Sequence, residues 1–111
     1  MTLFLRRATF SDIDILYKWV NDSDVRKSAF NTKQISYEDH VSWFNRMMMN
    51  VDEAQYILML DDNAIGQIRL SMTNNEAKID YSISKTVRGH GYGKEIIRLL
   101  KSKIREDFPY D

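Results

Sequence analysis

The run Arg88-Gly89-His90-Gly91-Tyr92-Gly93 has the residue types and the spacing to bind an anion. It holds three of the four glycines in the 111-residue chain. Glycine adopts positive φ without strain and lets a ligand approach the backbone closely. An alternating apolar segment precedes the run and a segment with helical spacing follows it, so the run would open a helix. The first amides and the positive dipole end of a helix attract phosphate, and we predict a phosphate or pyrophosphate site here.

Four further side chains are candidates for binding, and each has an ordinary structural alternative. Lys94 stands at the expected helix start, where a cation is disfavoured unless it serves a phosphate. Arg26 could bind a nucleotide phosphate with its guanidinium, or be a surface arginine. His40 could bind a substrate or act as a base, or be a helix-surface histidine. Trp43 could stack on a base such as uracil, or belong to the core.

Hydrophobic periodicity and turn residues predict the elements that would position these side chains. We predict a first strand at Thr2 to Thr9 and a helix that begins after the N-cap Ser11 and ends at about Val20, where Asn21-Asp22-Ser23-Asp24 breaks it. A loop that can include a helical turn follows from Val25 to Ile35, and Ser36 caps a second helix. Three strands follow, at Gln55 to Leu60, at Ala64 to Met72 and at Ala77 to Ser84. The last element is a helix that begins at the glycine run and has Ile96, Ile97, Leu100 and Ile104 on one side.

This order, β-α-α-β-β-β-α, predicts an α+β fold and not a doubly wound sheet, because short turns join the last three strands. The spacing of the glycines matches neither the G-x-G-x-x-G of dinucleotide-binding folds nor a P-loop. The strand before the glycine run alternates, so that Ile79 and Tyr81 share one face while Asp80 lies on the other. The length of the chain, with no repeat or linker in it, indicates a single domain over residues 1–111.

Composition excludes several classes of protein. Sixteen basic and sixteen acidic residues give a formal net charge of zero, which argues against a general affinity for nucleic acid or for an anionic membrane. The chain has no cysteine, so disulfides and thiolate metal sites are excluded, and we expect no metal. No apolar run reaches the roughly 18–20 residues of a membrane span, and no signal-peptide pattern opens the sequence. We therefore expect a cytoplasmic protein.

A strand, the pattern Arg-x-x-Gly-x-Gly and a helix form the acetyl-CoA signature of the GNAT N-acetyltransferases, and the glycine run resembles it. The order of elements agrees with that fold along the whole chain, and the fold has a mixed, mainly antiparallel sheet. The resemblance implies that loop amides hold the pyrophosphate of acetyl-CoA, and that the preceding strand pairs with the pantetheine arm. The residues implied in coenzyme binding are Ile83, Ser84, Arg88, Gly89, His90, Gly91, Tyr92, Gly93 and Lys94.

The first half of the chain resembles GNAT enzymes that acetylate amino-sugar nucleotides in flagellin, pseudaminic-acid or spore-coat polysaccharide pathways. This resemblance implies acetyl transfer from acetyl-CoA to a primary amine, by direct attack in a ternary complex. It also implies that Arg26, His40 and Trp43 lie near the acceptor. Ribosomal-protein N-terminal acetyltransferases share part of the pattern, so a protein α-amine stays open as the acceptor. The resemblance rests on Trp19-Val20-Asn21-Asp22, Val25-Arg26, Phe30, Ile35, His40 and Trp43-Phe44.

Members of the family continue past the corresponding helix with another strand, a helix and a β-hairpin. This C-terminal part often supplies the tyrosine that protonates the leaving thiolate. The resemblance therefore implies that this chain is truncated after the acetyl-CoA-binding helix, and it leaves the catalytic residues unassigned. Candidates for the base are Asp80 or Glu76, acting through water, and His40. An incomplete sheet has open edges, which favours a homodimer or completion by another chain. A non-catalytic acyl-CoA-binding or interaction module is the alternative function.

Overall fold

One antiparallel sheet forms the centre of the fold, in a computed structural model that describes residues 2–29 and 33–107. Within these residues all three strand pairings are antiparallel, so the mixed sheet that the sequence predicts is not seen. Asp61, Asn74 and Asn75 adopt positive φ in the two tight turns, which polar turn residues tolerate well. The strands, in their order across the sheet, are β1 (Leu3–Arg7), β2 (Glu53–Leu60), β3 (Asn63–Thr73) and β4 (Glu76–Ile83).

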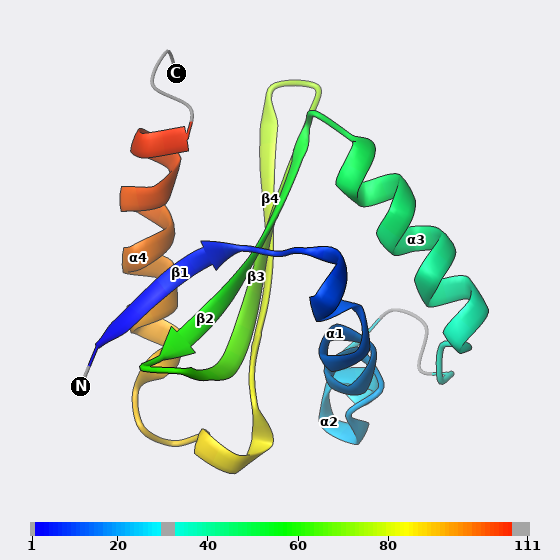
Figure 1. The fold of residues 1–111 in the computed structure, drawn as a ribbon, viewed down its shortest axis with the longest axis horizontal. Coiled ribbons are helices and arrows are strands. Elements are labelled where there is room, and N and C mark those ends of the chain that lie inside the picture. Colours follow the sequence, from blue (N-terminus) through cyan, green and yellow to red (C-terminus); the bar gives the residue numbers. More distant parts are fainter. Residues whose placement is uncertain (1, 30–32, 108–111) are drawn as a thin grey trace.

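Helices cover both faces of this sheet (Figure 1). The helix α4 (Tyr92–Asp107) lies on one side, and α1 (Ile13–Val20) and α3 (Tyr37–Met49) lie on the other. A short helix α2 (Ser23–Ser28) follows α1. The α+β class that the sequence predicts is confirmed. None of the helices in residues 2–29 and 33–107 combines the length and apolar character that a membrane crossing requires.

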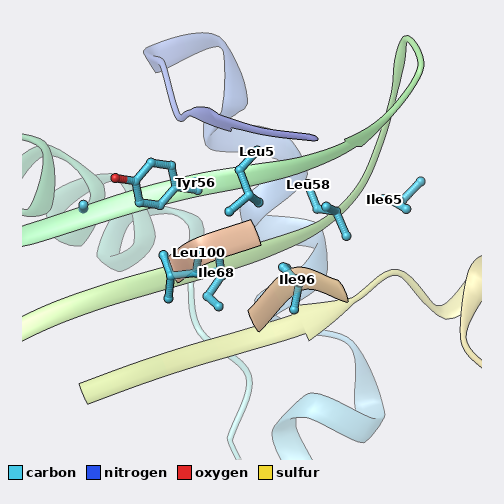
Figure 2. Close-up of a cluster of buried hydrophobic side chains, with 8 residues drawn as sticks. Leu5, Tyr56, Leu58, Ile65, Ile68, Ile96 and Leu100 are labelled. Atoms are coloured by element: carbon cyan, nitrogen blue, oxygen red, sulfur yellow. The ribbon is translucent and has the colours of Figure 1, made fainter. Parts of the chain in front are cut away.

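Two apolar clusters hold these layers together. Figure 2 shows the cluster between the sheet and α4, to which Tyr56 and Leu58 of β2 contribute. On the opposite face Ile57 packs against α1 and α3. Because successive side chains of a strand point to opposite faces, β2 is apolar on both. Each large side chain buried in this way stabilises the fold by roughly 1.5–3 kcal/mol. The buried residues of this cluster are Leu5, Ala54, Tyr56, Leu58, Ile65, Ile68, Ile96 and Leu100.

The structure corrects the sequence interpretation of the segment after α1. The predicted loop from Val25 to Ile35 begins inside α2, so three helices, and not two, stand between β1 and β2. The Asp22 side chain accepts a hydrogen bond from the Asp24 amide at 2.9 Å and starts this extra helix. Asp22 to Asp24 belong to the polar stretch that was expected only to end α1. An aspartate at the N-cap position can follow the end of one helix and start the next.

The predicted cap of α1 is wrong, whereas that of α3 is confirmed. Ser11 is not the N-cap of α1, because it lies within a 3₁₀ turn at Phe10–Asp12. The cap position of α1 is Asp12. The predicted cap of α3 is confirmed, since the Ser36 hydroxyl accepts a hydrogen bond from the Asp39 amide at 3.2 Å.

A bidentate ion pair fixes the turn from β1 into α1. The two terminal nitrogens of Arg6 donate to the two carboxylate oxygens of Asp12 at 2.7 and 2.8 Å. The Thr9 amide donates to the same carboxylate at 2.8 Å. The hydrogen bonds from Arg6, helped by Thr9, outweigh the effect of burial and hold the pKa of Asp12 below its usual 3.8.

A second polar contact anchors the far end of α4 to the sheet. The Tyr56 hydroxyl donates to Asp107 Oδ2 at 2.6 Å, and Arg7 lies beside both groups, 3.4 Å from the phenol oxygen and 3.5 Å from the carboxylate. Burial, together with the bond to Asp107, raises the pKa of Tyr56 to about 12. The contact fixes the end of α4 opposite to the glycine run.

Candidate functional site

The glycine-rich run forms a loop with left-handed residues ahead of α4. Gly89 has a φ of +89° and Gly91 has a φ of +82°. A Cβ at either position would meet no atom within 4 Å, so the backbone conformation, and not a lack of space, requires glycine. Gly93 lies in the first turn of α4, where a Cβ would stand 3.7 Å from Tyr81. The expectation that this run uses positive φ is confirmed for its first two glycines.

The start of α4 presents amides that the protein itself does not use. The Glu95 amide reaches back to the Gly91 carbonyl at 3.5 Å. The amides from Gly91 to Lys94 have no acceptor among residues 2–29 and 33–107. Because α4 is 16 residues long, they stand at the positive end of a full helix dipole. This arrangement suits an oxyanion, and the exposed His90 and Lys94 lie beside it.

The Arg88 side chain ties the loop to α2. Its Nε donates to the Ile83 carbonyl at 2.8 Å, and its terminal nitrogens pair with Asp24 at 3.0 Å and Asp22 at 3.4 Å. Partial burial alone would raise the pKa of Asp22, but hydrogen bonds from backbone amides and the charge of Arg88 outweigh it and hold that pKa below 3.8. The guanidinium that was expected at the coenzyme is therefore engaged by the protein, where it positions the loop.

The strand β4 is an edge of the sheet in the described residues, and only some of its main-chain groups face outward. The Ser84 amide donates to the Ile65 carbonyl at 2.7 Å, and the Ser84 carbonyl accepts from the Val87 amide at 3.0 Å. In an antiparallel ladder alternate residues turn their main-chain groups to the partner strand. Those of Tyr81 and Ile83 therefore point to the open edge. Both main-chain groups of Ser84, for which a coenzyme contact is predicted, thus have partners within the protein.

A cavity of about 690 Å³ lies beside this edge, walled by the three helices that follow β1 and by β2, β3 and β4. Trp19 of α1 and Val25 of α2 contribute apolar surface. Ile83 and Arg88 also line it, so the cavity extends to the residues that lead into the glycine loop. The loop with its unpaired amides and this cavity thus adjoin each other.

His40 is a buried residue of this wall and not the helix-surface histidine of the alternative interpretation. Its side chain is only 2% exposed, and its Nε2 lies 2.8 Å from the Ile13 carbonyl. A carbonyl oxygen can only accept, so Nε2 carries a proton and donates it to this bond. The ring also packs against Tyr17 and Trp43, with centroids 5.3 and 5.5 Å away.

A row of polar side chains crosses β2, β3 and β4 on the cavity wall. Gln55 Nε2 donates to Gln67 Oε1 at 2.7 Å and to two main-chain carbonyls at 3.2 and 3.3 Å. Three acceptors around this nitrogen fix the orientation of Gln55, so Gln67 turns its own nitrogen to Asp80 Oδ2 (3.4 Å) and Ser82 Oγ (3.2 Å). Asp80 therefore lines the cavity with a carboxylate that accepts hydrogen bonds, and such a group can take a proton from an amine.

The other predicted residues divide between the cavity and the rest of the molecule. Arg26 and Trp43 line the cavity, and an Arg26 terminal nitrogen donates to the Lys33 carbonyl at 3.3 Å. Glu76 lies at the far end of β4, opposite Thr73, and is not on the wall. Phe30, one of the residues behind the finer resemblance, lies outside the described residues.

Arg69 is a wall residue that the sequence interpretation missed, together with the two glutamines. Its guanidinium lies over the Trp43 ring, with the Cζ atom 5.1 Å from the ring centroid. Gln67 and Arg69 are polar at alternate positions of an otherwise apolar stretch of β3. That period-2 interruption is the sequence signal that would have identified a functional face on this strand. Residues 2–29 and 33–107 contain no group of His, Asp and Glu side chains arranged to hold a metal.

Comparison with known proteins places this geometry in a family. A family profile described as "Acetyltransferase (GNAT) domain" matches residues 2–111. A search of curated proteins found no match.

Solved structures with the same fold include a domain from Methanocaldococcus jannaschii, with 19% identity and a TM-score of 0.78 over 96% of this chain and 72% of that one. Spermidine N-acetyltransferase from Vibrio cholerae, in complex with CoA and spermine, has 19% identity and a TM-score of 0.77 over 86% and 59%. An aminoglycoside acetyltransferase in complex with coenzyme A has 21% identity and a TM-score of 0.80 over 96% and 69%. The chain thus spans between 59% and 72% of these proteins. At such identities the likeness shows the fold.

Proposed function

The chain belongs to the GNAT acetyltransferase family, and we propose that it transfers the acetyl group of acetyl-CoA to a primary amine. One observation carries the proposal. Left-handed Gly89 and Gly91 open a loop whose amides, from Gly91 to Lys94, have no acceptor in the described protein. Amides of this kind at the positive end of a long helix are suited to the pyrophosphate of coenzyme A. Structures of the same fold contain CoA, which agrees with this assignment.

The position of the cavity supports a reaction by direct attack. A pantetheine arm has amides that can pair with the outward main-chain groups of Tyr81 and Ile83, as an added strand does. The acceptor amine in the cavity then attacks the thioester carbonyl, so that a C–N bond forms, the C–S bond breaks and the thiolate leaves. Asp80 takes the ammonium proton, directly or through water. Holding both substrates side by side contributes roughly 7–11 kcal/mol in favourable cases.

We propose an amino-sugar nucleotide as the acceptor. Its support is the resemblance of the first half of the chain, and three of the residues behind it, Arg26, His40 and Trp43, gather on the cavity wall. Related folds hold other small amines, spermine among them. Mass spectrometry tests the choice: a gain of one acetyl group on a 4-amino-sugar nucleotide, and none on peptides, supports it. Acetylation of peptides alone would assign the protein α-amine instead.

A binding module without catalysis is the second candidate, and the edge strand β4 favours it. Ile79 and Tyr81 on this strand are 47% and 46% exposed, and an open, partly apolar edge pairs readily with another chain. Light scattering that shows a dimer, together with acetyl-CoA binding and no turnover over an amine panel, would support this function. A strict monomer that turns over substrate would exclude it.

The acetyl-transfer proposal is tested with acetyl-CoA and an amine panel, by mass spectrometry and thiol release. The loop variant is Gly91→Glu, which strains a left-handed position and adds a negative charge beside the proposed pyrophosphate. Ser102→Glu is the matched control, because it adds the same charge to the exposed surface of α4 away from the loop. Loss of turnover in Gly91→Glu alone supports the assignment. Equal turnover in both variants, or none in the wild type, contradicts it.

A further inference from the structure

Arg69 occupies an unusual position for a charged side chain. It stands on β3 with its guanidinium over Trp43, and its side chain is only 27% exposed. Its Nε is buried and has no hydrogen-bond partner, and the guanidinium donates to no other group in residues 2–29 and 33–107. A guanidinium offers five donors in a fixed fork. Buried donors are nearly always paired, so an exception on a cavity wall requires an explanation.

Glu53 does not supply the missing hydrogen bond. Its Oε1 lies 3.9 Å from Arg69 Nε, which is beyond hydrogen-bond distance. Both carboxylate oxygens are already engaged, one by the Ser71 hydroxyl and the other by the Asn50 side-chain amide, each at 3.1 Å. Glu53 therefore reduces the cost of holding the charge of Arg69, and it leaves the donor fork open.

Asp80 does not pair with Arg69 either, although the two residues are direct partners in the β3–β4 ladder. Opposite side chains on one face of a sheet have Cβ atoms roughly 4.5–5.5 Å apart, a distance that normally lets opposite charges meet. Here Gln67 donates to Asp80, and Arg69 turns to Trp43. A carboxylate and a guanidinium thus line the same cavity without neutralising each other.

We infer that Arg69 binds an oxyanion of the acceptor, so that the enzyme selects amines that also carry a phosphate or a carboxylate. Arg69 holds the anion through its fork while Asp80 takes the proton of the amine, and Trp43 keeps the guanidinium in place by stacking. Of the other cations of the wall, Arg88 is paired with Asp24, and an Arg26 terminal nitrogen donates to the Lys33 carbonyl. The inference rests on the proposed acetyl transfer, and it disfavours purely cationic polyamines as acceptors.

The experiment compares matched amines that differ only in the anion. Phosphoethanolamine is paired with ethanolamine, and β-alanine with β-alaninamide. For the wild type we expect kcat/KM to be roughly ten- to a hundredfold higher with the anionic member, which is what one or two charge-assisted hydrogen bonds supply. The two pairs distinguish a phosphate from a carboxylate. In Arg69→Gln the ratio of anionic to neutral amine falls towards one, and Arg69→Lys, which keeps the charge without the fork, is intermediate. Arg98→Gln, on the exposed surface of α4, is the control.

A measurement without turnover keeps the inference separate from the proposed function. In the wild type, inorganic phosphate and acetate are titrated while the ¹H–¹⁵N signal of Arg69 Nε–Hε is followed by NMR. A saturable shift of that signal, absent from the other arginine signals, supports the site even if no amine is acetylated. If amines are acetylated but anionic and neutral members react alike, the inference fails and the acetyltransferase stands. An Arg69 signal that neither anion shifts also overturns it.

Discussion

Replacement of Tyr56 by phenylalanine tests how the sheet holds the far end of α4. The Tyr56 ring is fully buried, and its hydroxyl donates to Asp107 at 2.6 Å. Phenylalanine keeps the packing and removes only that bond. Asp107 is 27% exposed, so water can solvate its carboxylate again, and we expect a loss of about 1–2 kcal/mol in the free energy of unfolding at pH 8.

The pH dependence gives this prediction its sharpest form. The pKa of Tyr56 is about 12 in the folded protein and 10.0 when the chain is unfolded. Burial first, and then the bond to Asp107, raise this pKa, so the stability that the neutral phenol contributes is fully present below pH 10 and is lost as the pH rises through 12. At pH 11 linkage gives a loss of about 1.4 kcal/mol relative to pH 8. Solvent around the partly exposed Asp107 makes this an upper value.

Urea unfolding of the wild type and of Tyr56→Phe, at steps from pH 8 to pH 11, measures both effects. The stability difference between the two proteins should be largest at pH 8 and should narrow towards pH 11. Tyr81→Phe is the control, because the Tyr81 phenol is exposed and donates to no described residue. A difference that stays constant over this range would refute the reasoning, since the phenol would then titrate alike in both states.

Three further predictions concern the core, the first turn and the cavity wall. Leu100→Ala should lower the free energy of unfolding by about 2–5 kcal/mol in urea melts, because Leu100 is 1% exposed in the cluster under α4. Asp12→Asn should cost about 1–3 kcal/mol at pH 7. Because the pKa of Asp12 is lowered, that difference should disappear as the pH falls through the folded value below 3.8, and melts at pH 2 to 7 check it. Gln67→Leu should lower kcat by roughly ten- to a hundredfold through a misplaced Asp80. The Kd of this variant for acetyl-CoA should stay unchanged. A rise in that Kd alongside the loss of kcat would contradict the role of Gln67 in positioning Asp80.

Most helices and strands, and the glycine loop, could be predicted from the sequence because their signals are local. Alternation revealed the strand that became β4, and clustered glycines predicted left-handed residues at Gly89 and Gly91. Ser36 marked a helix start because a cap bonds to an amide only three residues away. The cap at Asp22 is equally local, but Asp22 was interpreted only as part of a helix breaker, so the sequence allowed a helical turn after it and did not predict where α2 begins.

The interactions that define the site could not be predicted because they join distant parts of the chain. His40 is buried and bonded to the Ile13 carbonyl, 27 residues earlier in the sequence. Helical spacing alone could not reveal this contact. Arg88 belongs to a loop that fits the coenzyme signature, but its side chain is bound by Asp24, 64 residues earlier. Arg69 acquires its position only when β3 packs beneath Trp43 of α3.

The most direct test of the central claim is an NMR titration of the ¹⁵N-labelled protein with acetyl-CoA. If the amides at the head of α4 hold the pyrophosphate, the largest shifts fall on Gly91, Tyr92, Gly93 and Lys94, with smaller ones at the outward amides of β4. Saturating acetyl-CoA that leaves these four signals in place, or that shifts residues of another surface instead, would contradict the account.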